Sequence, residues 1–137
     1  MSWIWLDGIE SFEKGGRVSA WKMWQADFPR AYLVEMIAQA GALLLGAETD
    51  FQKDIVFTKI EDTEFTGEPL AGKRLAIGAE AENLREEGGW FRGRIFQDGQ
   101  KILEGRVLLM NVGRLRPDGQ GPVTFPLLLI EALRQER

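Results

Sequence analysis

The segment that most constrains the fold is the apolar run at residues 32–45, which has the sequence YLVEMIAQAGALLL. It contains only two strongly polar side chains, Glu35 and Gln39, and their spacing of four stacks them on one face of an α-helix. A helix this apolar must be wrapped by other structure, and a carboxylate on it is costly to bury without partners or a chemical role. The sequence therefore predicts a central helix at about residues 31–46, with Glu35 as a candidate functional residue.

Composition and charge exclude several classes of protein. The 137 residues, 45% of them hydrophobic, predict one globular domain spanning 1–137. A formal net charge of −4 argues against a nucleic-acid binder. No basic segment precedes the first apolar residues, and the central run is too short and too polar to cross a bilayer. We therefore expect a cytoplasmic protein without a membrane span.

The chain contains neither histidine nor cysteine. Without cysteine there are no disulfides and no thiolate chemistry, and without histidine the commonest general base is missing. No spacing typical of a metal site or a phosphate loop is present, so we expect neither a metal nor a cofactor. What remains is a carboxylate placed as in an enzyme, without the partner that such enzymes usually need.

Most of the remaining sequence predicts β-structure. Alternation of side chains and enrichment in β-branched and aromatic residues predict strands at 17–24, 54–65, 73–84, 89–97 and 101–112. Asp98-Gly99 is a strong hairpin signal between the last two strands. A short amphipathic C-terminal helix is expected at about residues 126–136.

The order of these elements predicts the architecture. One strand, one long apolar helix and four antiparallel strands follow one another along the chain. A helix that is buried all round cannot lie on a flat open sheet, so the sheet must curl around it or a partner must cover its far side. We therefore expect an α+β fold with an antiparallel sheet wrapped around one long central helix, in a dimer.

Three segments of the chain resemble a known family. Asp27-Phe28-Pro29, residues 33–40 (LVEMIAQA) and residues 64–75 (EFTGEPLAGKRL) resemble the hot-dog 3-hydroxyacyl-acyl-carrier-protein dehydratases of the FabZ and FabA type. In that family a His-Phe-Pro loop precedes the helix, and glutamine follows the acidic helix residue by four positions. Here Asp27 stands where the family has its catalytic histidine, and the glycine whose N–H polarises the thioester carbonyl is missing or replaced.

The resemblance implies a FabZ-like protein of fatty-acid or polyketide-type metabolism. It would bind acyl-carrier-protein or coenzyme A thioesters, as a homodimer or as a heterodimer with a hot-dog homologue, without a cofactor. Glu35 would be the catalytic acid and Asp27 a substitute base; apart from the resemblance, Asp27 equally fits a loop residue or a cap near the start of the helix. Gln39 would orient Glu35 or form hydrogen bonds at a dimer interface. The further candidates for contact with a substrate are Phe28, Pro29, Arg30 and Tyr32, although the two aromatic residues fit a core equally well and Arg30 could pair with Asp27 or Glu35 or be solvated.

Several functions remain open at this point. The chain could be a catalytically impaired dehydratase subunit that completes the site of a histidine-bearing partner. It could be a thioesterase that needs only Glu35 to activate water. It could be a dehydratase that uses Asp27 with Glu35, or a non-enzymatic acyl-binding or assembly module. Basic residues in the second half could dock an acidic carrier protein or form a solvated face: Lys73, Arg74, Arg92, Arg94, Arg106, Arg114 and Arg116.

Overall fold

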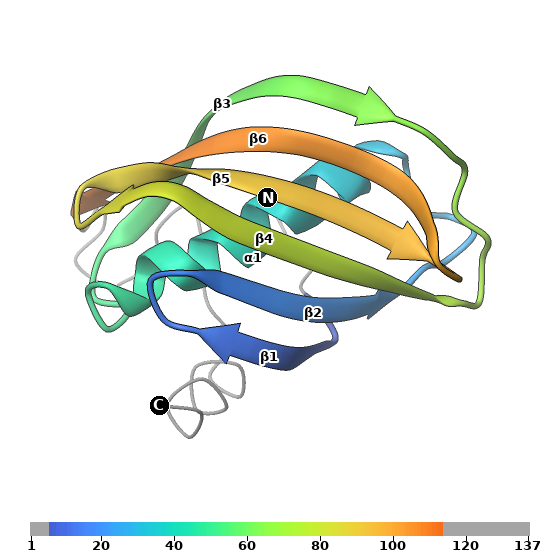
Figure 1. Cartoon of the computed structure of the whole chain (residues 1–137), viewed down its shortest axis with the longest axis horizontal. Helices are drawn as coiled ribbons and strands as arrows, with labels where there is room; N and C mark the ends of the chain where they lie inside the picture. The colour runs from blue at the N-terminus through green and yellow to red at the C-terminus, as the bar shows by residue number, and fades with distance from the viewer. Residues whose placement is uncertain (1–5, 114–137) are drawn as a thin grey trace.

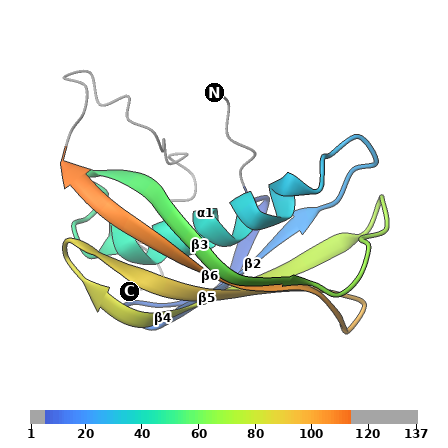
Figure 2. The ribbon, with the colours of Figure 1, turned by 90° about the horizontal axis from the view of Figure 1, so that it is seen from above.

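A computed structural model describes residues 6–113, in which one curved antiparallel sheet covers one helix (Figures 1 and 2). The elements are β1 (Gly8–Glu13), β2 (Arg17–Met23), α1 (Ala31–Ala47), β3 (Asp54–Phe65), β4 (Arg74–Arg85), β5 (Gly88–Gln97) and β6 (Gln100–Gly113). The strand order is β1-β2-β4-β5-β6-β3, and all five neighbouring pairs are antiparallel. The expected α+β architecture is confirmed. The C-terminal helix expected at 126–136 lies outside the described residues.

The helix α1 lies in the concave side of the sheet, as Figure 2 shows. It is buried without interruption from Met36 to Ala47. The sheet presents to it the inward-facing residues of each strand, which alternate with outward-facing ones. On β4 the inward residues are Leu75, Ile77 and Ala79, all almost fully buried.

The closest approach of helix and sheet is made at glycines. Gly93 on β5 lies directly under Ile37, and a Cβ atom at this position would overlap the Ile37 side chain. One turn further along α1, a Cβ on Gly41 would lie 3.1 Å from the side chains of Leu109 and Phe91. The missing side chains therefore let the sheet close tightly around the helix.

The strand β1 was not predicted from the sequence, so the helix is preceded by two strands rather than one. Its pairing with β2 shifts register between Ile9 and Ser11. This bulge breaks the alternation by which a strand is recognised, because Ile9 and Phe12 then pack on the core without the expected spacing of two.

The hairpin predicted at Asp98-Gly99 is confirmed. Both residues have positive φ, 51° and 79°, as a two-residue turn of type I′ requires. The turn pairs Gln97 with Gln100 and sets the register of β5 and β6.

Substituting Gly93 by alanine should destabilise the fold by about 1–3 kcal/mol, because the added methyl overpacks the contact with Ile37. Gly78→Ala is the matched control, because Gly78 lies on neighbouring strand β4 and its Cβ would meet nothing closer than 4.0 Å. Urea unfolding of both variants tests this, and equal losses of stability would contradict the assigned contact.

Candidate functional site

The carboxyl group of Glu35 is partly buried in the second turn of α1. Burial removes water from around the group and raises the pKa of Glu35 above its ordinary value of 4.5. The side chain of Glu35 forms no hydrogen bond or ion pair with any other residue of the range 6–113. The raised pKa increases the protonated fraction of this carboxyl above that of an ordinary glutamate at the same pH, which suits a group that donates a proton.

Gln39, one turn after Glu35, is fully buried with 0% of its surface exposed. Neither its Nε2 nor its Oε1 atom has a hydrogen-bond partner among the described residues. The hydrogen bond to Glu35 by which Gln39 would orient the carboxylate is therefore not formed in the single chain. An amide buried without partners is unfavourable, and such groups in a folded protein need an explanation.

Asp27 is exposed in the loop before the helix. The residue at the N-cap of α1 is Arg30, and no side chain caps the helix. The prediction that Asp27 caps the helix is therefore wrong. Its role as a substitute base stays a prediction, and the burial that would make an aspartate a useful base is absent in the described part of the chain.

Three aromatic side chains form a continuous row that leads to the helix. The rings of Trp24 and Phe28 meet edge to face with centroids 5.4 Å apart, and Phe28 and Tyr32 lie at the same centroid distance. The carbonyl of Pro29 accepts a hydrogen bond of 3.0 Å from the N–H of Tyr32, which fixes the start of the helix. Phe28 and Tyr32 both pack against the core, as aromatic residues at helical spacing usually do.

Arg30 contacts neither Asp27 nor Glu35, the two partners considered from the sequence. Its guanidinium lies 4.2 Å from the centroid of the Phe65 ring and 3.4 Å from Oε1 of Glu68. These groups border a cavity of about 420 Å³ between the loop before α1 and the loop at 66–73. The cavity is lined by Trp24, Ala26, Phe28, Arg30, Glu68, Pro69 and Ala71.

Gln97, which the sequence analysis did not single out, holds the second wall of this cavity. It is 6% exposed, accepts a hydrogen bond of 2.7 Å from the N–H of Leu70, and donates one of 3.0 Å to the carbonyl of Leu70. The sequence contains a signal for this role of Gln97. The inward positions at the end of β5 are Phe91, Gly93, Ile95 and Gln97. Glutamine at the last of these positions breaks the otherwise apolar pattern.

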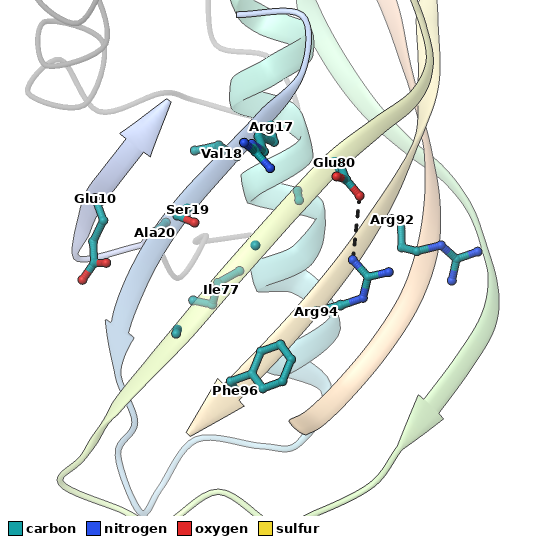
Figure 3. A pocket seen from close by; sticks show the side chains of 13 residues that line it. Glu10, Arg17, Val18, Ser19, Ala20, Ile77, Glu80, Arg92, Arg94 and Phe96 are labelled. Atoms are coloured by element: carbon teal, nitrogen blue, oxygen red, sulfur yellow. Dashed lines mark ion pairs between the residues drawn. The ribbon is translucent and has the colours of Figure 1, made fainter. Parts of the chain in front are cut away.

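A second hollow, of about 260 Å³, lies on the outer face of the sheet (Figure 3). Its floor includes Ser19 and Gly78, and Arg94 and Phe96 stand at its side. Val18 and Ile77, the neighbours of the floor residues along their strands, are buried on the inner face. This hollow is therefore separated from α1 and Glu35 by the sheet.

The basic residues of the second half are mostly paired with acids on this outer face. Arg106 contacts Glu61 at 2.8 Å and Glu82 at 2.9 Å, while Arg92 and Arg94 both contact Glu104. A hydrogen bond from Lys101 lowers the pKa of Glu104 below its usual value. This face carries both signs of charge rather than an excess of positive charge. Arg114 and Arg116 lie outside the described residues.

Residues 6–113 contain no group of three or more acidic side chains that could hold a metal ion. Within the same range, no helix has both the length and the apolar character needed to span a membrane.

The chain matches no protein-family model and no curated protein sequence. Its structure is similar to a hypothetical thioesterase with coenzyme A from Streptococcus pneumoniae TIGR4, with a TM-score of 0.64 and 14% identity over 77% of this chain and 84% of that chain. It is also similar to the dehydratase heterocomplex ApeI:P from Xenorhabdus doucetiae, with a TM-score of 0.69 and 16% identity over 85% and 86%. The PaaI protein from the phenylacetic acid degradation operon of E. coli has a TM-score of 0.64 and 14% identity over 75% and 81%.

These similarities confirm that the chain has the hot-dog fold, as the resemblance predicted. Neighbours of this fold include thioesterases and a dehydratase. At these levels of identity the agreement defines the fold and leaves the activity to be argued from the site.

The raised pKa of Glu35 predicts how stability depends on pH. The protonated carboxyl is the form the fold favours, so its contribution is present below the ordinary pKa of 4.5 and is lost as pH rises through the raised pKa. The Glu35→Gln variant has no carboxyl to ionise at this position and so does not lose stability in this way as pH rises. It should therefore be more stable than the parent at about pH 8 but not at about pH 4. Urea unfolding at the two pH values tests this, with Glu64→Gln on exposed β3 as control. A Glu35→Gln advantage that is equal at both pH values would contradict the assignment.

Replacing Gln97 by methionine should free the loop at 66–73, because methionine keeps the length of the side chain and removes its hydrogen bonds. Leaving the Leu70 amide without its partner should cost about 1–3 kcal/mol of unfolding free energy. It should also speed hydrogen exchange at that amide. Gln100→Met, at the exposed first position of β6, is the control and should change neither quantity. Unchanged exchange at Leu70 in Gln97→Met would contradict the role of Gln97.

Proposed function

We propose that this chain is a FabZ-like subunit that binds fatty acyl thioesters beside Glu35 and relies on a second hot-dog subunit for the catalytic base. Without that subunit it is catalytically impaired, because the sequence contains no histidine. The single observation that carries the proposal is the pair formed by Glu35 and Gln39. One is an acid with a raised pKa, and the other is a buried amide with no partner among residues 6–113.

Gln39 supports a site that a ligand or a partner completes. An amide sealed in a finished core would be expected to have hydrogen-bond partners. Because Gln39 has 0% of its surface exposed in the single chain, a thioester carbonyl or a polar group of a second subunit could accept from its Nε2 only after the residues around it rearrange. Glu35 lies one turn earlier on the same helix, so both groups could act on one bound molecule.

The proposed chemistry removes water from a 3-hydroxyacyl thioester. A base on the partner takes the proton from C2, and the electrons of that C–H bond form the C2=C3 double bond. The C3–O bond breaks, and the protonated carboxyl of Glu35 gives its proton to the departing hydroxyl, which leaves as water. A raised pKa keeps more of Glu35 in the protonated form that this step needs.

A second subunit has an edge of the sheet available for pairing. The strand β3 is the outermost strand beside β6, and much of it from Thr58 to Phe65 is exposed. Edge strands present unpaired N–H and C=O groups that another chain can use. A second copy could pair at this edge but would bring no histidine, so the partner that supplies the base is a histidine-bearing homologue. A dehydratase heterocomplex exists among proteins of similar fold, which favours such a pairing.

A second candidate is a thioesterase in which ionised Glu35 activates water. It is favoured by the thioesterases of similar fold. It also needs fewer catalytic groups, since a carboxylate can activate water without a histidine. The two candidates need opposite protonation states of Glu35, so ionisation of Glu35 with rising pH lowers the dehydratase activity and raises the thioesterase activity.

The test measures hydration of a crotonyl thioester and release of free thiol, by the chain alone and mixed with a histidine-bearing hot-dog dehydratase whose own helix carboxylate is replaced by an amide, so that its homodimer is inactive. We expect no hydration by the chain alone, a mixed complex in native mass spectrometry, and hydration by that complex. Glu35→Gln should lower this hydration by about 100-fold or more. Glu48→Gln, at the other end of α1, is the matched control.

Thiol release by the chain alone that increases as pH rises, and that is lost in Glu35→Gln, would replace the proposal by the thioesterase. If the chain binds no thioester and forms no mixed complex, both candidate functions are contradicted.

A further inference from the structure

The cavity beside the start of α1 contains one positive side chain. Among the residues of the range 6–113 that line it, Arg30 is the only base and Glu68 the only acid. The others, among them Trp24, Phe28 and Pro69, are apolar. The polar character of this cavity therefore depends on the pair formed by Arg30 and Glu68.

The position of the Arg30 guanidinium is fixed more firmly by Phe65 than by Glu68. It lies over the Phe65 ring at 4.2 Å from the centroid, which holds it against one face. Its contact with Glu68 is 3.4 Å, and the two side chains are 50% and 75% exposed. An ion pair this exposed is weak, so another anion can replace Glu68 without a large cost.

The walls around this guanidinium are held by the backbone. The N–H of Trp24 donates to the carbonyl of Lys73, and the N–H of Gly72 donates to the carbonyl of Trp24. Gln97 fixes Leu70 in the same loop. An incoming group would therefore meet a cavity that is already shaped.

The cavity lies next to the proposed acyl site. Phe28 lines it and packs on Tyr32, and Tyr32 precedes Glu35 by three residues on α1. At a rise of 1.5 Å per residue, Arg30 lies about 7.5 Å from Glu35 along the helix axis. The two side chains leave the helix about 140° apart around its axis, so the arm of a thioester bound at Glu35 would pass around the start of α1 to reach Arg30.

We infer that Arg30 binds the phosphate of the pantetheine arm that carries the acyl thioester, and that this phosphate displaces Glu68. The inference rests on the proposed function, because it assumes a thioester at Glu35. A guanidinium presents paired N–H donors that match phosphate oxygens, and the bonds are strengthened by charge. When the arm is absent, Glu68 forms an ion pair with the guanidinium of Arg30. Glu68 therefore competes with the phosphate for this guanidinium.

Binding of three acyl thioesters with one acyl chain tests this: the coenzyme A thioester, the phosphopantetheine thioester, and the pantetheine thioester, which lacks the phosphate. Calorimetry measures each Kd for the parent chain and its variants, so that no catalytic activity is needed. Arg30→Ala should weaken the two phosphate-bearing ligands by about 10- to 100-fold, as loss of a charge-assisted pair does. It should leave the pantetheine thioester unchanged.

Glu68→Gln gives a result of opposite sign. Removal of the competing carboxylate should tighten both phosphate-bearing ligands by a few-fold, roughly what a weak exposed pair contributes. Arg17→Ala is the matched control for loss of a surface arginine, because Arg17 is exposed, pairs with Glu13 at 3.3 Å, and borders the hollow on the outer face of the sheet. It should change none of the three Kd values. Thermal unfolding checks that all variants are folded.

Equal weakening of all three ligands by Arg30→Ala would overturn the inference, and so would no weakening of any. An effect on the coenzyme A thioester alone would also overturn it, because Arg30 would then contact the nucleotide rather than the phosphate shared with carrier proteins. In these cases the parent chain still binds thioesters and the proposed function stands. If the parent chain binds none of the three ligands, both proposals fail together.

Discussion

The contact between Ile37 and Gly93 is the constraint on which the rest of the structure depends. Because β5 has no side chain at that point, the sheet can close on α1 and bury it from Met36 to Ala47. An apolar helix held this tightly cannot turn about its axis without overlaps, since interiors are close-packed. The direction in which Glu35 and Gln39 project is therefore set by packing at Ile37, two residues from each of them. The position of the site is a consequence of the core.

The helix combines two features that oppose each other energetically. Most of it is apolar and stabilises the fold by burial, whereas Gln39 is buried with no partner in the described part of the chain and Glu35 is partly stripped of water. Polar groups placed at an energetic cost on an otherwise apolar element are typical of sites where structure serves chemistry. The interior that makes the helix stable also raises the pKa of Glu35 and so increases the fraction in the protonated form that the proposed reaction uses.

The sequence was sufficient for those parts of the fold that depend on local patterns. The run at 32–45 predicted α1, alternation predicted five of the strands, and Asp98-Gly99 predicted the hairpin. Strand β1 was missed because its bulge removes the alternation. The contact of Arg30 with Glu68 could not be predicted either, because those residues are far apart in the sequence and meet only after the sheet has formed. Gln97 could have been found, since it is a polar residue at an inward strand position.

The two hydrogen bonds between Gln97 and Leu70 join two parts of the molecule that are distant in sequence. They tie the loop at 66–73 to the end of β5, and the ion pair of Lys73 with Asp98, at 2.8 Å, ties the same loop to the hairpin turn. The Lys73–Asp98 pair is exposed and therefore weak, so the connection between the cavity wall and the turn depends mainly on the two hydrogen bonds of Gln97. A sequence change beside Gln97, in the exposed turn, would act on the shape of the cavity through these bonds. Sequence differences in this turn between related chains can therefore change which ligands the cavity binds, although no residue that contacts the ligand has changed.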